Sequence, residues 1–166
     1  MVKVSTFISK AAEFQELDSK YPIPQRPNGG TSYAFPSNSD NLSDLQMDDW
    51  LLFLGSWRGY IAYQISKLEG QLFILSEGFD LMLSTKIAGL EAESSKRLLK
   101  DSLKGQAVLE DEELQNLKIR IIDLSAESKL LKGRLSLYES QFETLSRVIT
   151  RRGHERMRLR VFLVLI

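Results

Sequence analysis

Six arginines lie within fourteen residues near the C-terminus, and their side chains are the strongest chemical signal in this sequence. They are Arg147, Arg151, Arg152, Arg156, Arg158 and Arg160, with Glu155 as the only acidic residue among them. Guanidinium groups contact phosphate in a bidentate manner, and a dense cationic cluster attracts polyanions. Like charges four residues apart also destabilise a helix, by roughly 0.2–0.5 kcal/mol per pair. The cluster therefore predicts contact with nucleic acid.

Helical spacing divides these arginines into two rows. One row holds Arg147, Arg151 and Arg158, and the other holds Arg152, Arg156 and Arg160. An alternative to nucleic-acid contact is a set of salt bridges between subunits, made to the acidic segment 40–49 or to the run 110–113. Both interpretations stay open at this point.

The cluster is hidden by a neutral average. The chain has 22 basic and 22 acidic residues, so the part outside 147–160 holds 16 basic against 21 acidic side chains. There is no cysteine and only one histidine, His154, which we interpret as a surface or phosphate-contact residue. No phosphate-binding loop, dinucleotide fingerprint or nucleophile motif occurs. We expect a protein that is not an enzyme, with no catalytic residue, metal site or cofactor.

Hydropathy predicts an intracellular protein of the cytoplasm. The N-terminus has no apolar stretch of signal-peptide length. No apolar run approaches the roughly 18 residues that a membrane span needs. The last six residues, 161–166, are apolar but too short to cross a bilayer. We expect no membrane partner, although an arginine-rich helix with an apolar tail also fits a peripheral membrane protein.

Proline and glycine separate an N-terminal segment from the rest. All four prolines, Pro22, Pro24, Pro27 and Pro36, lie near Gly29 and Gly30, which predicts an extended arm over residues 19–41. A short helix is expected before it, over 4–18. The expected division is 1–41 for the helix and arm, 42–160 for long helices that oligomerise and bind nucleic acid, and 161–166 for the apolar tail.

The proline-free remainder predicts an all-α fold of long helices. Ser43 and Gln46 resemble a capping box at the start of the first long helix. Its apolar positions are Leu54, Trp57, Ile61, Ile65, Leu68, Leu72, Leu75, Phe79 and Met82. Gly59, Gly70 and Gly78 weaken this helix and permit close packing or a bend, and a break is expected near Gly89 or Gly105.

The second long helix carries an apolar seam in unbroken steps of three and four. Its members are Leu114, Leu117, Ile121, Leu124, Ser128, Leu131, Leu135, Tyr138, Phe142, Leu145 and Ile149. This spacing predicts a coiled coil or an antiparallel helical hairpin, within or between chains. Because Trp50, Phe53 and Tyr60 add apolar surface, we expect a homo-oligomer with cyclic symmetry. All the seam positions except Ser128 and Tyr138 are assigned to that interface.

The stretch 135–153 resembles the C-terminal helix of UvsY-type recombination mediators of tailed phages. The helix over 57–89 is similar in placement to that family's long N-terminal helix. Where the family carries a leucine-flanked pair of basic residues implicated in single-strand binding, this sequence has Lys86 but Ser84 in place of the other. The departure shifts weight onto Arg151 and Arg152. The resemblance covers about residues 45–155.

That resemblance implies a ring-shaped oligomer that binds single-stranded DNA, displaces a single-strand-binding protein and loads a recombinase filament. Lys86 and the six arginines are the expected nucleic-acid contacts, with Trp57, Tyr138 or Phe142 as possible stacking partners. The alternative is a structural coiled-coil protein of a virion or scaffold, whose arginines hold subunits together.

Overall fold

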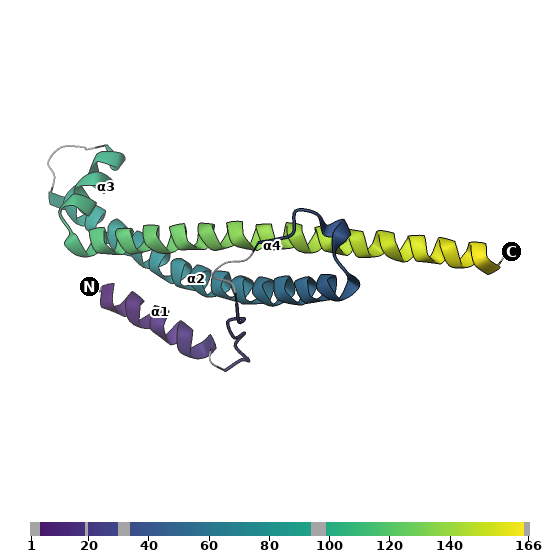
Figure 1. Cartoon of the computed structure of the whole chain (residues 1–166). Helices are drawn as coiled ribbons and strands as arrows, with labels where there is room; N and C mark the ends of the chain where they lie inside the picture. Colours follow the sequence, from purple (N-terminus) through teal and green to yellow (C-terminus); the bar gives the residue numbers. More distant parts are fainter. Residues whose placement is uncertain (1–3, 19, 30–33, 94–98, 165–166) are drawn as a thin grey trace. The chain divides into compact units, whose positions relative to one another are not determined.

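The computed structural model describes residues 4–18, 20–29, 34–93 and 99–164. All regular secondary structure in these ranges is helical (Figure 1). The elements are α1 (Val4–Asp18), a 3-10 helix η1 (Ser39–Asn41), α2 (Asp44–Glu93), α3 (Lys100–Leu109) and α4 (Glu112–Val164). The prediction of an all-α fold is confirmed.

The two long helices begin at side-chain caps. Ser43 and Gln46 form the reciprocal capping box that was predicted: the Ser43 amide donates to Gln46 Oε1 at 2.9 Å, and the Gln46 amide donates to Ser43 Oγ at 3.3 Å. At the start of α4, Asp111 accepts from the Leu114 amide at 3.2 Å. Each cap satisfies amides that the first turn leaves without a helical partner, which fixes where the helix begins.

The breaks between helices differ in detail from the expectation. Gly89 lies inside α2, which ends four residues later at Glu93, and Gly105 lies inside α3. The second break falls at residues 110–111, directly before α4. Residues 161–164, expected to be a separate tail, continue α4 without interruption.

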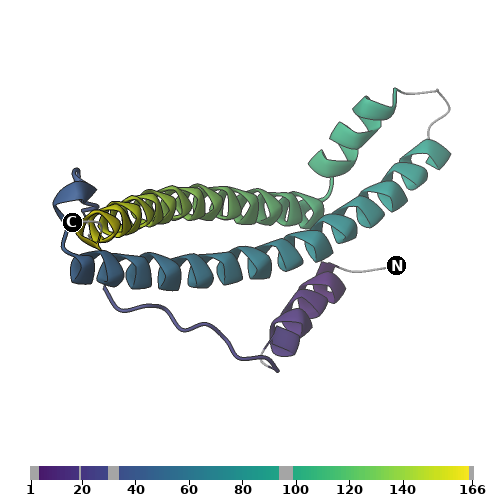
Figure 2. The same cartoon turned by 90° about the vertical axis from the view of Figure 1, so that its right-hand side faces the viewer.

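The chain forms two compact units, each made from segments that are distant in sequence. Unit 1 comprises 1–23 and 64–130, and unit 2 comprises 24–63 and 131–166. In each unit a stretch of α2 runs antiparallel to a stretch of α4, side by side (Figures 1 and 2). Composition had suggested a sequential division instead, because composition does not reveal which distant segments pack together.

The apolar seam of α4 is buried within a single chain. All eleven of its positions are buried or half-buried, as are the nine apolar positions expected along α2. Leu54, Leu114 and Leu145 are completely buried, and Ser128 is buried among apolar neighbours. The helical hairpin thus satisfies the heptad pattern without a second copy. The homo-oligomer stays a prediction, and its interface would need other surfaces, such as those around the exposed Leu52 and Phe73.

Two glycines of α2 receive aromatic side chains from α1 in unit 1. A Cβ at Gly70 would overlap the ring of Phe14, and a Cβ at Gly78 would overlap the ring of Phe7. These glycines therefore permit the close packing that was expected of them. Gly59 has no such neighbour within 4 Å.

Candidate nucleic-acid interface

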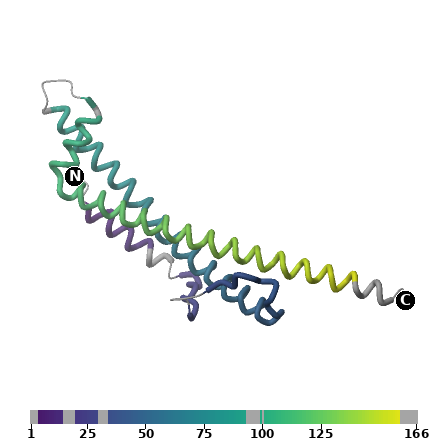
Figure 3. The backbone as a smooth tube through the Cα atoms, turned by 45° about the horizontal axis from the view of Figure 1, so that its top comes forward, coloured from purple at the N-terminus to yellow at the C-terminus, as the bar shows by residue number. Residues whose placement is uncertain are grey.

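The C-terminal part of α4 in unit 2 carries the arginines in two distinct rows. Arg147, Arg151, His154 and Arg158 follow one another along one face, at intervals of four, three and four residues. Together with Ser146, Thr150 and Glu155 they line a shallow groove of about 520 Å³. We call this the arginine groove. α4 extends beyond the first residue of α2 in this unit, so this region is accessible (Figures 1 and 3).

The second row faces the start of α2 and η1. The Asp44 carboxylate accepts from Arg152 Nη1 at 3.2 Å and from Arg156 Nη2 at 2.6 Å. Arg152 also donates to the backbone carbonyl of Asp40 at 2.6 Å. The sequence suggested such pairs with segment 40–49 between subunits, and the structure forms them within one chain.

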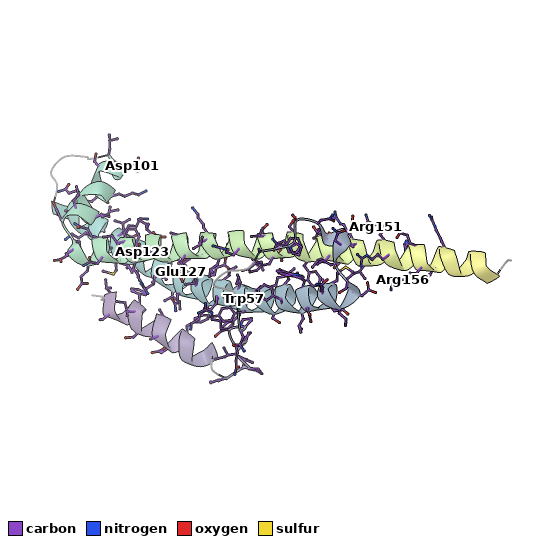
Figure 4. The ribbon with its side chains drawn as sticks, in the orientation of Figure 1. Trp57, Asp101, Asp123, Glu127, Arg151 and Arg156 are labelled. Atoms are coloured by element: carbon purple, nitrogen blue, oxygen red, sulfur yellow. The ribbon has the colours of Figure 1, made fainter. Side chains whose placement is uncertain are left out.

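One arginine belongs to both settings. Arg151 lines the arginine groove, yet its guanidinium also donates to the carboxylate of Asp40. Asp40 lies in η1, where its amide donates to Asn38 Oδ1 at 3.0 Å. Figure 4 shows Arg151 and Arg156 on α4 close to the beginning of α2. Asp40 of η1 and Asp44 at the start of α2 thereby hold three of the six arginines.

The ion pairs of Asp44 lower its pKa, and the pairs of both Asp40 and Asp44 remain exposed to solvent. The hydrogen bond from Arg156, followed by its charge and by the hydrogen bond and charge of Arg152, holds the pKa of Asp44 below its ordinary value of 3.8. Slightly more than half of the Asp40 and Asp44 side chains remains accessible. Exposed pairs are weakened by solvent and salt, so an external phosphate can compete with these carboxylates for the same guanidinium groups.

Two arginines of the groove are not held by Asp40 or Asp44. Arg147 lies 3.4 Å from Glu143 with 82% of its side chain exposed. Arg158 is exposed and has no acidic partner among the described residues. The side chain of Arg160 lies outside the described residues. Lys86, the remaining expected contact, lies half-buried on α2 and belongs to unit 1, whereas the arginines belong to unit 2.

The expected stacking residues are not available on the surface. Trp57 is 7% exposed and Tyr138 is 6% exposed, so neither ring can receive a base without local unfolding. Phe142 is half-buried, and the Arg58 guanidinium lies 4.7 Å from its ring centroid. Arg58 also approaches Glu139 at 3.8 Å. The interface is therefore cationic and polar rather than aromatic.

Sequence reasoning missed two features of unit 2. It assigned no role to Arg58, because the cation–π contact of Arg58 with Phe142 depends on the pairing of α2 with α4, which the sequence does not give. It also counted Trp50 and Phe53 as apolar surface without predicting that their spacing along a helix places their rings in one row with Trp57 and Tyr60. Within the described residues, no cluster of three or more His, Asp or Glu side chains could hold a metal ion.

The fold adds one finding about membranes: no helix in the described ranges is both long and apolar enough to span a bilayer.

Comparison with protein-family models, with curated proteins and with solved structures finds no match. The resemblance to UvsY-type mediators thus stays a prediction, and the chemistry of the arginine groove is the firmest basis for a function.

Proposed function

We propose that this protein is a non-enzymatic binder of single-stranded DNA, and that the arginine groove of α4 makes the contact. The observation that carries the proposal is the line of Arg147, Arg151 and Arg158 along one exposed helix face. A row of guanidinium groups suits a chain of phosphates, and the carboxylates that pair with this row, those of Glu143 and Asp40, make only solvent-exposed pairs with it.

The groove has the length for several phosphates. From residue 147 to residue 158 a helix rises by roughly 17 Å, at about 1.5 Å per residue. The hydroxyl groups of Ser146 and Thr150 donate to carbonyls of their own helix, each at 2.9 Å. Their hydrogens are thus already used, and the arginines supply the free donors.

Binding of this kind has little base preference. Phosphate contacts fix position on a strand without reading its sequence, whereas stacking needs exposed aromatic rings. Trp57 and Tyr138 are buried. We therefore expect affinity to depend strongly on salt and weakly on base composition.

The role as a recombination mediator rests on the resemblance to the UvsY-type family. In that role the protein would help load a recombinase filament onto single-stranded DNA that a single-strand-binding protein covers. An arginine row able to exchange between its own aspartates and DNA phosphates suits a protein that holds a strand and then releases it.

A second candidate is a structural coiled-coil protein of a virion or scaffold. The ion pairs of Arg151, Arg152 and Arg156 with Asp40 and Asp44 favour it, because they give these arginines a purely structural use. It gives no role to the exposed Arg158, and it gives Arg147 only a pair with Glu143 on the same helix.

The two candidates differ in one titration. A fluorescent single-stranded oligonucleotide is titrated with wild-type protein and with Arg147→Ala/Arg158→Ala, and its anisotropy is recorded. The DNA-binding proposal predicts weaker binding by the double variant. The matched control is Lys129→Ala/Arg134→Ala, which removes two exposed cations elsewhere on α4. Equal weakening by both double variants would reduce the effect to net charge and refute the groove.

A further inference from the structure

An uninterrupted row of aromatic rings runs along the first turns of α2 in unit 2. Trp50 and Phe53 meet edge to face with centroids 5.6 Å apart, and Phe53 is 6.3 Å from Trp57. Trp57 and Tyr60 continue the row at 5.9 Å. We call these four residues the aromatic row. Both tryptophans of the chain belong to it.

The proline-rich arm of the same chain contacts this row at two points. The Phe35 ring meets Trp50 edge to face at 5.6 Å, and the Arg26 guanidinium lies 5.9 Å from the Trp57 centroid. Residues 22–27 and 34–36 have no helix or strand, and Pro27 and Pro36 are half-buried. Figure 2 shows the arm passing beside the beginning of α2.

The arm occupies the row incompletely. Only 7% of Trp57 is exposed, yet its indole Nε1 has no acceptor among the described residues. A buried donor without a partner costs roughly 1–3 kcal/mol. A groove of about 310 Å³ also remains open beside the row, lined by Gln46, Asp49, Trp50 and Phe53. A ligand that displaced the arm from Trp57, filled this groove and offered a carbonyl to the indole would match the surface better than the arm does.

The chemistry of the arm indicates the chemistry of that ligand. Proline-rich segments adopt the polyproline II conformation without further ordering, and aromatic grooves recognise them through ring contacts and exposed carbonyls. Arg26 shows that a cation fits against Trp57, and the carboxylate of Asp49 favours a basic ligand. We propose that the aromatic row is a docking surface for a proline-rich, basic segment of a partner protein, and that the arm covers this surface until the partner displaces it.

The test uses the full chain with its arm weakened. Arg26→Ala/Phe35→Ala removes the two ring contacts of the arm and leaves the aromatic row intact. The probe is a synthetic peptide with the sequence of residues 21–38, titrated while tryptophan fluorescence is recorded. We expect saturable binding to the variant at least about tenfold tighter than to wild type, because wild type carries the competing arm in the same molecule. A control peptide has its four prolines replaced by alanine and should bind at least about tenfold more weakly.

Three results would overturn the proposal. They are no saturable change with the variant, equal affinity for wild type and variant, or equal affinity of the two peptides. Far-ultraviolet circular dichroism checks that the variant keeps the helical content of wild type. If it does not, Pro27→Ala/Pro36→Ala replaces it, because this change weakens the arm without touching the aromatic row. Adding Trp50→Ala to either variant should abolish binding, and retained binding would place the peptide elsewhere.

Discussion

Replacing Asp40 and Asp44 by asparagine should increase the affinity for single-stranded DNA and make it more sensitive to salt. These two residues hold Arg151, Arg152 and Arg156 in the folded chain. Asparagine keeps the size of each side chain and removes its charge. The three guanidinium groups then lose their charged partners and become available to phosphate, although Arg152 keeps its hydrogen bond to the backbone carbonyl of residue 40.

The magnitude follows from the number of free arginines. Each phosphate neutralised on a single strand adds roughly −0.7 to the slope of log affinity against log salt. Arg147 and Arg158 alone give a slope of about −1.4 per chain, and all five arginines give about −3.5. Between 50 and 200 mM salt, affinity then falls about 7-fold for wild type and about 130-fold for Asp40→Asn/Asp44→Asn.

The assay is fluorescence anisotropy with a labelled oligonucleotide at four or more salt concentrations. Asp48→Asn/Asp49→Asn is the matched control, because it removes the same charge from the next turn of α2, where no described ion pair to an arginine occurs. If both double variants steepen the slope equally, net charge explains the effect. If both the slope and the affinity of Asp40→Asn/Asp44→Asn equal those of wild type, the paired arginines do not contact DNA.

Three further predictions test the packing within the two units and the ion pairs of Asp44. Leu145→Ala should lower the free energy of unfolding by about 2–5 kcal/mol, because Leu145 is completely buried. Leu52 is 72% exposed, so Leu52→Ala should change this free energy by less than about 0.5 kcal/mol. Equal losses of the two variants in urea titrations would contradict the burial of the seam. Gly70→Ala/Gly78→Ala should displace α1 and expose it to limited proteolysis, because each new Cβ overlaps an aromatic ring of α1. The control Gly59→Ala meets no neighbour and should stabilise α2 by about 1 kcal/mol. An unchanged digestion pattern of the double variant would show that α1 does not pack on these glycines. The pKa of Asp44, followed by NMR, should lie below 3.8, so the contribution of this carboxylate to stability is present above pH 3.8 and is lost as the pH falls through the lower pKa of the folded state. Arg156→Ala should return the pKa of Asp44 toward 3.8. A pKa of 3.8 in the wild-type protein would mean that the ion pair between Asp44 and Arg156 does not persist.

The helices could be predicted from the sequence because their signals are local. The capping box at Ser43 and the three-four spacing from Leu114 to Ile149 act within one or two turns, so they are legible without the fold. The spacing also separated the arginines into two rows, and the groove holds Arg147, Arg151 and Arg158 as one of them.

Long-range pairing was beyond the sequence. The heptad seam states that α4 needs an apolar partner, but it does not state whether that partner lies in the same chain. The same ambiguity affected the arginines: the alternative of salt bridges placed their acidic partners across a subunit boundary, and these partners lie in η1 and α2 of the same chain. Trp57 was expected to receive bases for a similar reason, since its burial depends on packing that only the fold reveals.

The most direct test of the proposed function is the affinity of the wild-type protein for a single-stranded oligonucleotide as salt is raised from about 50 to 200 mM. Contact through the arginine groove predicts saturable binding at the lowest salt, with a slope of log affinity against log salt of about −1.4 or steeper per chain. Absence of binding at 50 mM salt, or binding that does not weaken with salt, would contradict the assignment of the arginine groove as a nucleic-acid interface.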